Sequence, residues 1–398
     1  MEDFAPLVAC VALATIALFT RSLERSPVTV PMLCVLLGFG LFLIDELPME
    51  LLSGDLSILA EVALAVVLFT DAAHLKLARL NERKSWALRM LFIGTFLAFA
   101  LGTLFFIPLF PDLPFWEVAL VAALLVPTDA ALGQAILSNE QIPEHIRDIL
   151  TAESGLNDGL FLPLIIFLAC AAVGFHHDLA QANWALFAGQ QIGFGLGIGA
   201  LLGSLGGLAS QRSIEKGFAV ADNTAVFALA LVAVTYFAAE AVGGNSFVAV
   251  FVSGLCFGRF AKNCAARAKK FLETDGILLV MVAFFFIGAL MLPDGLARVH
   301  WQTIVAVTLS LFVVRPAAVY LSMLGTKTTP RARLFLGWFG PRGLATALFT
   351  LIILADFGDK LQSKVILSVT MVAFAASTLL HGVTAHYALR FWGKSKDV

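Results

Sequence analysis

Apolar segments of about 20 residues recur along this chain, separated by short polar gaps. A bilayer-crossing helix needs about 20 mainly apolar residues, and thirteen segments reach or approach that length. Of the 398 residues, 60% are hydrophobic and 14% are charged, whereas soluble domains are about 25% charged. The sequence therefore predicts an all-α polytopic membrane protein with thirteen transmembrane helices, at 4–20, 28–44, 56–75, 86–109, 115–137, 146–174, 184–209, 222–241, 245–260, 275–292, 301–324, 331–354 and 362–390.

Lys and Arg residues are distributed unevenly between the polar gaps. When residues at the segment ends are counted with the adjoining gap, alternate gaps and the C-terminal end hold 20 of the 26 Lys and Arg residues. The other gaps hold three, and Arg89, Arg315 and Arg342 fall inside segments. Because Lys and Arg accumulate in cytoplasmic loops, we expect the N-terminus outside and the C-terminus inside a bacterial inner membrane.

An odd number of spans has a topological consequence. Six helices, one linker helix and six further helices place the two sets of six in opposite orientations across the membrane. Inverted repeats of this kind are common in secondary transporters, whose substrate sites lie near the midplane where broken helices meet. The net charge of −2 gives no indication of a nucleic-acid partner.

The fifth helix of each predicted set of six carries a helix-breaking motif. These motifs are Val126–Asp129 and Gly337–Gly343, and each contains a proline and a charged residue. Proline removes a backbone donor, and freed backbone at membrane depth is tolerated only where protein or water satisfies it. We therefore expect both helices to be broken, with Asp129 at the positive N-terminal end of a half-helix and Arg342 at a negative C-terminal end.

The sixth span opens with polar residues in an apolar context, Glu153–Gly159. At 100° per residue, Ser154 and Asp158 share one helix face, and Glu153 and Asn157 share the adjacent one. Ionisable groups inside a membrane are costly and mark functional sites by default. The two faces are expected to have different partners.

Asp129 and Asp158 would supply anionic oxygen ligands, with neutral oxygens from Ser154 and Thr128. No His or Cys lies nearby in the sequence to favour a transition metal, so the pattern predicts an alkali-cation site. Two close carboxylates in a weakly hydrated cavity cannot both ionise cheaply, and protons then compete with the cation for the same oxygens. Competition of this kind is the chemistry of exchange.

Arg315 is one of the three basic residues inside predicted spans. A carboxylate at this depth requires a cation, and Arg315 is the candidate partner for Glu153. Such a pair would remain charged while Asp129 and Asp158 exchange ions.

With these motifs, the chain resembles the NhaP-type sodium/proton antiporters of the cation:proton antiporter superfamily, which are related to the animal sodium/proton exchangers. The resemblance covers nearly the whole chain. Its most specific parts are Pro127–Asp129, Glu153–Gly159, Arg315–Pro316, Gly340–Gly343 and the stretch from Gly244 to Gly258.

The resemblance implies roles for individual residues. Asp129 and Asp158 would bind Na+ or Li+ and carry protons, with Ser154 and the Thr128 backbone assisting. Asn157 would tie the fifth and sixth helices together through Thr128. An Asn-Asp pair rather than an Asp-Asp pair in the sixth helix implies electroneutral exchange, with one cation per proton and no cofactor.

The resemblance also implies a homodimer in which a core moves against a dimerisation domain. Residues 1–80 and 181–298 would form the dimerisation domain with the linker, and residues 81–180 and 299–398 the ion-binding core. Relatives often carry an ion-site glutamate in a Leu-Phe-Glu context, but here Thr70 and Asp71 follow Leu-Phe. Asp71 either substitutes for that glutamate or meets the water interface.

Other functions remain open from the sequence. K+/H+ exchange is the nearest alternative, because size selection by a flexible carboxylate site cannot be derived from sequence. A sodium-coupled organic-solute symporter would need a larger polar pocket, and an intramembrane aspartyl protease would need Tyr-Asp and Gly-x-Gly-Asp motifs that this chain lacks at its aspartates. The glycine-rich seventh span, between residues 193 and 207, is interpreted as close helix packing rather than a nucleotide site.

Overall fold

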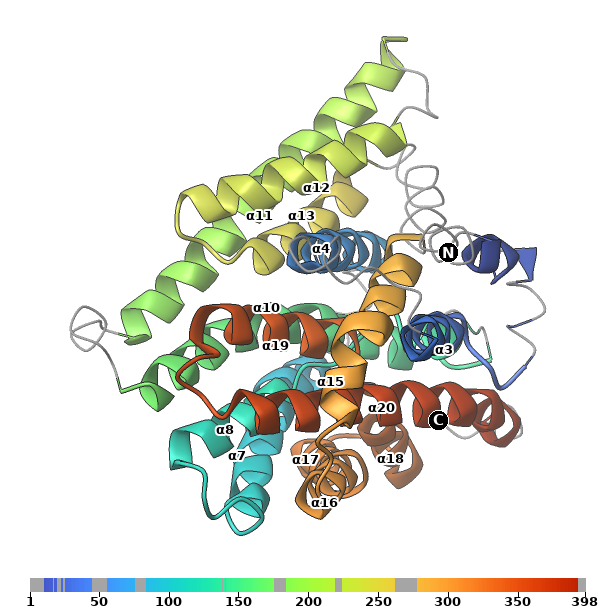
Figure 1. Ribbon diagram of the computed structural model, residues 1–398. Helices are drawn as coiled ribbons and strands as arrows, with labels where there is room; N and C mark the ends of the chain where they lie inside the picture. The colour runs from blue at the N-terminus through green and yellow to red at the C-terminus, as the bar shows by residue number, and fades with distance from the viewer. Residues whose placement is uncertain are drawn as a thin grey trace.

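A computed structural model describes residues 11–16, 18–19, 23, 26–44, 56–75, 84–137, 139, 141–174, 184–218, 224–261 and 278–392. Within these ranges the regular secondary structure is entirely helical (Figure 1). The first predicted span, 4–20, lies mostly outside the described residues. The all-α class that the sequence predicts is confirmed.

The described helices follow the predicted spans closely. In chain order they are α3 (Val30–Leu43), α4 (Leu56–His74), α6 (Lys84–Leu88), η2 (Arg89–Gly94), α7 (Thr95–Phe106), α8 (Phe115–Leu124), α9 (Gln134–Leu137), α10 (Glu144–Ala172), α11 (Trp184–Glu215), α12 (Thr224–Ala241), α13 (Ser246–Phe260), η4 (Ile287–Met291), α15 (Leu292–Leu296), α16 (Trp301–Leu309), η5 (Ser310–Val314), α17 (Arg315–Ser322), α18 (Pro330–Trp338), α19 (Leu344–Phe357) and α20 (Ser363–Trp392).

Six of the described helices are long and apolar enough to cross a membrane by length and composition. Shorter apolar helices accompany them, among them α8 and α19. These two are short because each has a helix break at one end. Helix α8 ends at Leu124, before the first break, and α19 begins at Leu344, after the second break that follows Trp338 of α18. The total of thirteen spans and the inverted repeat stay predictions.

Three long helices in the described part of the chain contain a π-helical turn. These turns are η2, η4 and η5, inside the helices that run from Ser85 to Phe106, Leu278 to Leu296 and Trp301 to Ser322. A π-helical turn changes the direction in which the following side chains point, and such turns are frequent at functional sites. The turn η5 comes directly before Arg315.

The helices form two groups with α10 and α19 between them (Figure 1). One group holds α4, α11, α12 and α13, and α13 packs on both α11 and α4. The other holds α7, α8, α16, α17, α18 and α20. The breaks of α8 and α18 therefore lie inside the molecule, next to α10.

Glycines bring α11 and α13 into backbone contact. Side chains at Gly195, Gly199 or Gly203 would collide with the α13 segment around residues 245–253, whereas Gly197 faces open space. Spacing of four residues places the three crowded glycines on one helix face. The interpretation of this segment as close helix packing is confirmed.

This packing predicts opposite effects at neighbouring glycines. Gly199→Ala should destabilise the protein by about 1–3 kcal/mol, because its methyl group meets the Ala249 backbone. Gly197→Ala should be neutral or stabilising by up to about 1 kcal/mol, because alanine is the better helix former. Thermal unfolding in one detergent would compare them, and equal midpoints would contradict the packing argument.

Candidate functional site

The two helix breaks hydrogen-bond to each other through Asp129. Its backbone N–H donates to the Pro341 carbonyl oxygen at 2.9 Å. Its carboxylate accepts from the Ala131 N–H at 2.8 Å and from the Leu344 N–H at 2.6 Å. Leu344 is the first residue of α19, so the carboxylate lies at the positive end of this half-helix, where an anion is stabilised.

The glycines of the second break allow this close approach. A Cβ atom on Gly343 would overlap the Asp129 carboxylate, and one on Gly340 would overlap the Arg315 guanidinium. A Cβ atom on Gly337 would contact the Pro316 backbone at 2.9 Å. The glycines thus leave room for charged side chains of other helices.

Helix α10 presents its polar residues to the first break. Ser154 Oγ and Thr128 Oγ1 lie 3.0 Å apart and are buried. Asn157 Nδ2 donates to the Val126 carbonyl oxygen at 3.5 Å. Asn157 therefore contacts the fifth span through Val126 rather than through Thr128, whose hydroxyl pairs with Ser154.

Asp158 is buried, with 2% of its surface exposed. Its Oδ1 atom has no hydrogen-bond partner among the described residues, and the same holds for Asn157 Oδ1. Asp158 lies one helical turn after Ser154, on the face of α10 that meets the first break. An unpartnered buried carboxylate oxygen costs free energy until a proton or cation reaches it.

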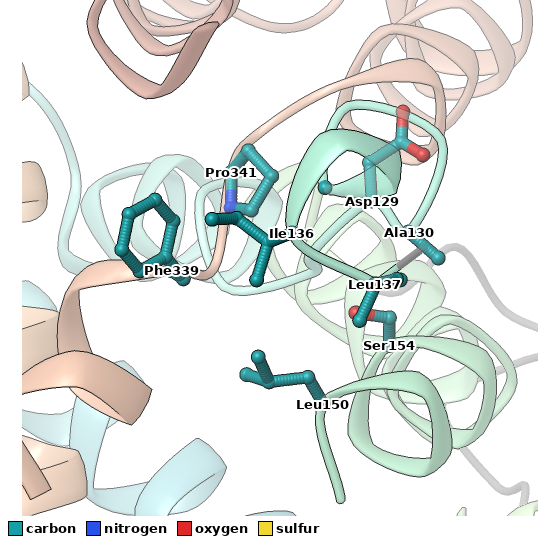
Figure 2. Close-up of a pocket in the computed structure, with 9 residues that line it drawn as sticks. Asp129, Ala130, Ile136, Leu137, Leu150, Ser154, Phe339 and Pro341 are labelled. Carbon is teal, nitrogen blue, oxygen red and sulfur yellow. The ribbon is translucent and has the colours of Figure 1, made fainter. Parts of the chain in front are cut away.

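A pocket reaches Asp129 and Ser154 (Figure 2). The space between its walls is about 220 Å³, including the part that opens to solvent. Apolar side chains of α9, the first third of α10 and the end of α18 form most of its wall. The lining residues are Asp129, Ala130, Gly133, Ile136, Leu137, Leu150, Ser154, Phe339 and Pro341.

Glu153 points to Arg315, away from this pocket. The two guanidinium nitrogens Nη1 and Nη2 each donate to one carboxylate oxygen at 2.9 Å. Both side chains are buried, at 2% and 4% exposure. Two parallel hydrogen bonds of this kind between a guanidinium and a carboxylate are among the strongest in proteins. They neutralise the charge of Glu153 and leave Asp158 as the other acid of the Glu153–Gly159 motif.

Arg342 lies in the second break and is almost fully buried. Its Nη1 atom donates to the Gly340 carbonyl oxygen at 3.1 Å, two residues beyond the end of α18. The cation is therefore at the negative end of a half-helix, where it is favourable.

Asp71 is half-buried in the last turn of α4 and is not among the pocket-lining residues. The two alternatives for its role stay open. Sequence reasoning missed Ser377 and His381 on α20, which contact the second break. The available signal was a histidine four residues after a serine within an apolar span.

Comparison with known proteins identifies the family of this chain. The model of the transmembrane sodium/hydrogen exchanger family matches residues 9–390. The chain belongs to the sodium/hydrogen exchanger family, in the NhaP-type branch of the cation:proton antiporter superfamily. The resemblance found in the sequence is confirmed, and the protein is a multi-pass membrane protein.

Individual relatives differ in the cation that their names carry. The K(+)/H(+) antiporter NhaP2 of Shewanella sp. (strain ANA-3) is 26% identical over 333 residues, covering 81% of this chain and 57% of that protein. This chain thus spans little more than half the length of that relative. The Na(+)/H(+) antiporter NhaH of Halobacillus dabanensis is 24% identical, with 96% of both chains covered.

A solved structure shares the fold. The sodium proton antiporter MjNhaP1 from Methanocaldococcus jannaschii at pH 8 superposes with a TM-score of 0.81 over 99% of both chains, at 19% identity. The likeness at this identity shows the fold alone.

The buried ion pair makes a prediction about stability. Glu153→Gln or Arg315→Gln should each destabilise the protein by about 3–5 kcal/mol, because each leaves one buried charge unpaired. The Glu153→Leu/Arg315→Met double variant should lose less than either single variant. Detergent thermal unfolding measures all three, and additive losses would argue against a coupled pair.

Proposed function

We propose that this protein is an electroneutral antiporter that exchanges one Na+ or Li+ for one proton by alternating access at Asp129 and Asp158. The observation that carries the proposal is the buried, unpartnered Asp158 oxygen, one helical turn after Ser154, whose hydroxyl contacts Thr128, the residue before Asp129. The paired hydroxyls of Thr128 and Ser154 add neutral oxygens at the first break. An oxygen-only donor set suits a hard cation.

The charged residues buried where the two helix breaks cross support an exchange of one cation for one proton. These charged residues are Asp129, Glu153, Asp158, Arg315 and Arg342. Three carboxylates and two guanidinium groups carry a net charge of −1. One proton or one monovalent cation neutralises it, and low polarity penalises both the empty and the doubly occupied site. Loading by one ion therefore requires release of the other.

Access to the site follows from the pocket. Its walls come from α9, the start of α10 and the residues that follow α18, and the gap between α9 and α10 is among those that the Lys/Arg bias predicts to be cytoplasmic. We assign this pocket to the cytoplasmic side of a bacterial inner membrane, with the N-terminus outside and the C-terminus inside. The proposed core, 81–180 and 299–398, would move against the dimerisation domain of a homodimer, formed by 1–80 and 181–298.

Ion choice divides the proposal from its nearest alternative, K+/H+ exchange. NhaP2 is named for K+ and NhaH for Na+, so the relatives do not decide it. The pocket wall is mainly apolar, and Asp129 and Ser154 are its acidic and hydroxyl residues. A sodium-coupled solute symporter would need a larger polar pocket.

Replacement of either exchangeable carboxylate should abolish transport. In vesicles with an imposed pH gradient, Asp158→Asn or Asp129→Asn should reduce Na+-dependent proton flux to the level of protein-free vesicles, because the proton and the cation lose their shared oxygens. Glu117→Gln is a matched control: Glu117 is buried but accepts from the Gln362 N–H elsewhere. Normal exchange by Asp158→Asn would remove the assigned mechanism.

Stoichiometry and ion choice can be measured together. A jump in Na+ or Li+ should move protons without a transient current on a supported membrane, because one charge leaves as one enters. K+ should produce less proton flux at equal concentration. A current would exclude one-for-one exchange, a larger K+ response would favour K+/H+ exchange, and Na+-driven solute uptake without proton flux would favour the symporter.

A further inference from the structure

His381 is a buried histidine with hydrogen-bond contacts at both ring nitrogens. Nε2 lies 2.8 Å from the Trp338 carbonyl oxygen, and Nδ1 lies 3.0 Å from Ser377 Oγ and 3.0 Å from the Ser377 carbonyl oxygen. The ring stacks on the Trp338 indole with centroids 5.2 Å apart. Only 3% of the residue is exposed, so its position is fixed by these contacts.

The chemistry of the partners assigns the direction of each hydrogen bond. A neutral imidazole has one N–H, and here Nε2 carries it and donates to the Trp338 carbonyl oxygen. The Ser377 carbonyl oxygen is then a neighbour of Nδ1 without a hydrogen bond. Ser377 Oγ accepts from the Arg342 backbone N–H at 2.6 Å. Its own hydrogen is then directed to Nδ1 of the neutral ring. Donors and acceptors are consistent from Arg342 through Ser377 and His381 to Trp338.

These contacts hold the second helix break at both ends. Trp338 is the last residue of α18, and Arg342 lies two residues before the start of α19. Pro341 lies between these two residues, and its carbonyl oxygen accepts from the Asp129 backbone N–H. Leu344, two residues after Arg342, donates its backbone N–H to the Asp129 carboxylate. A displacement of the break would move both partners of Asp129 at once.

We propose that Ser377 and His381 are positioning residues for the ion site: together they hold the break at 339–343 so that Pro341 and Leu344 bind Asp129. This role rests on the proposed exchange at Asp129. Neither residue lines the pocket that reaches Asp129. They act through the backbone of the break, without contact with the ion.

The chain offers conservative variants and a matched control on α20. Ser377→Thr keeps the hydroxyl that Arg342 and His381 share, and His381→Gln keeps a donor for the Trp338 carbonyl, whereas alanine at either position removes the contact. Thr378→Ala removes a neighbouring buried hydroxyl that donates to the Phe374 carbonyl oxygen of its own helix at 2.8 Å. It leaves the break untouched.

The test is the dependence of exchange rate on Na+ concentration in vesicles. Ser377→Ala and His381→Ala should raise the apparent KM for Na+ about tenfold, with a smaller change in maximal rate, because a lost buried hydrogen bond displaces a ligand of the ion. Ser377→Thr, His381→Gln and Thr378→Ala should stay within about twofold of the native KM. If His381→Ala does not fold, the Ser377→Ala and Ser377→Thr pair decides.

Several outcomes would overturn the positioning role. They are an unchanged KM in the alanine variants, a fall in maximal rate alone, no rescue by threonine or glutamine, and an equal loss in Thr378→Ala. Na+-dependent thermal stabilisation of the same proteins separates this proposal from the function. If the native protein binds Na+ without exchanging it, the exchange function is refuted, and the Na+ concentrations for half-maximal stabilisation still test the positioning role. If the native protein neither binds nor exchanges Na+, Li+ or K+, both proposals are refuted.

Discussion

Backbone groups inside a membrane must be hydrogen-bonded by protein, and this requirement governs the crossing of the two broken helices. Each break frees N–H and C=O groups, and lipid satisfies none of them. At the second break, the Asp129 backbone N–H and carboxylate satisfy two of these groups, the Pro341 carbonyl oxygen and the Leu344 N–H. The same carboxylate reaches the pocket. The fold and the ion site therefore share a single set of hydrogen bonds.

Asp158 differs from the acids around it in what it lacks. Glu153 has a guanidinium partner with two hydrogen bonds, and Asp129 has backbone donors on both oxygens. Asp158 Oδ1 has no partner among the described residues. The free energy spent on burying an incompletely bonded carboxylate is recovered when a proton or cation binds, and the proposed exchange at this site depends on that incomplete hydrogen bonding.

Sequence patterns located the elements of the site but not all of their contacts. Pro127 and the Gly340–Gly343 motif predicted the breaks because proline and glycine act locally on the backbone. The pairing of Glu153 with Arg315 could be predicted because only three basic residues lie inside the predicted spans. By contrast, the Asn157 contact with Val126, and the Ser377–His381 contacts with the break, depend on how helices far apart in sequence are rotated. No local pattern determines that rotation.

The distribution of polar contacts also bears on movement. The crossing is internally bonded by charged and backbone groups, whereas α10 meets α13 mainly through the Phe251 ring at Gly155 and Val248 at Gly159. One buried side-chain bond joins those two helices there, from Asn245 Nδ2 to the Gly159 carbonyl oxygen at 3.0 Å. Among the described residues, displacing the crossing as a unit along α13 breaks few polar contacts, while pulling the two breaks apart exposes several. For the proposed exchanger, alternating access would therefore cost least as a rigid-body shift that carries Asp129 and Asp158 together.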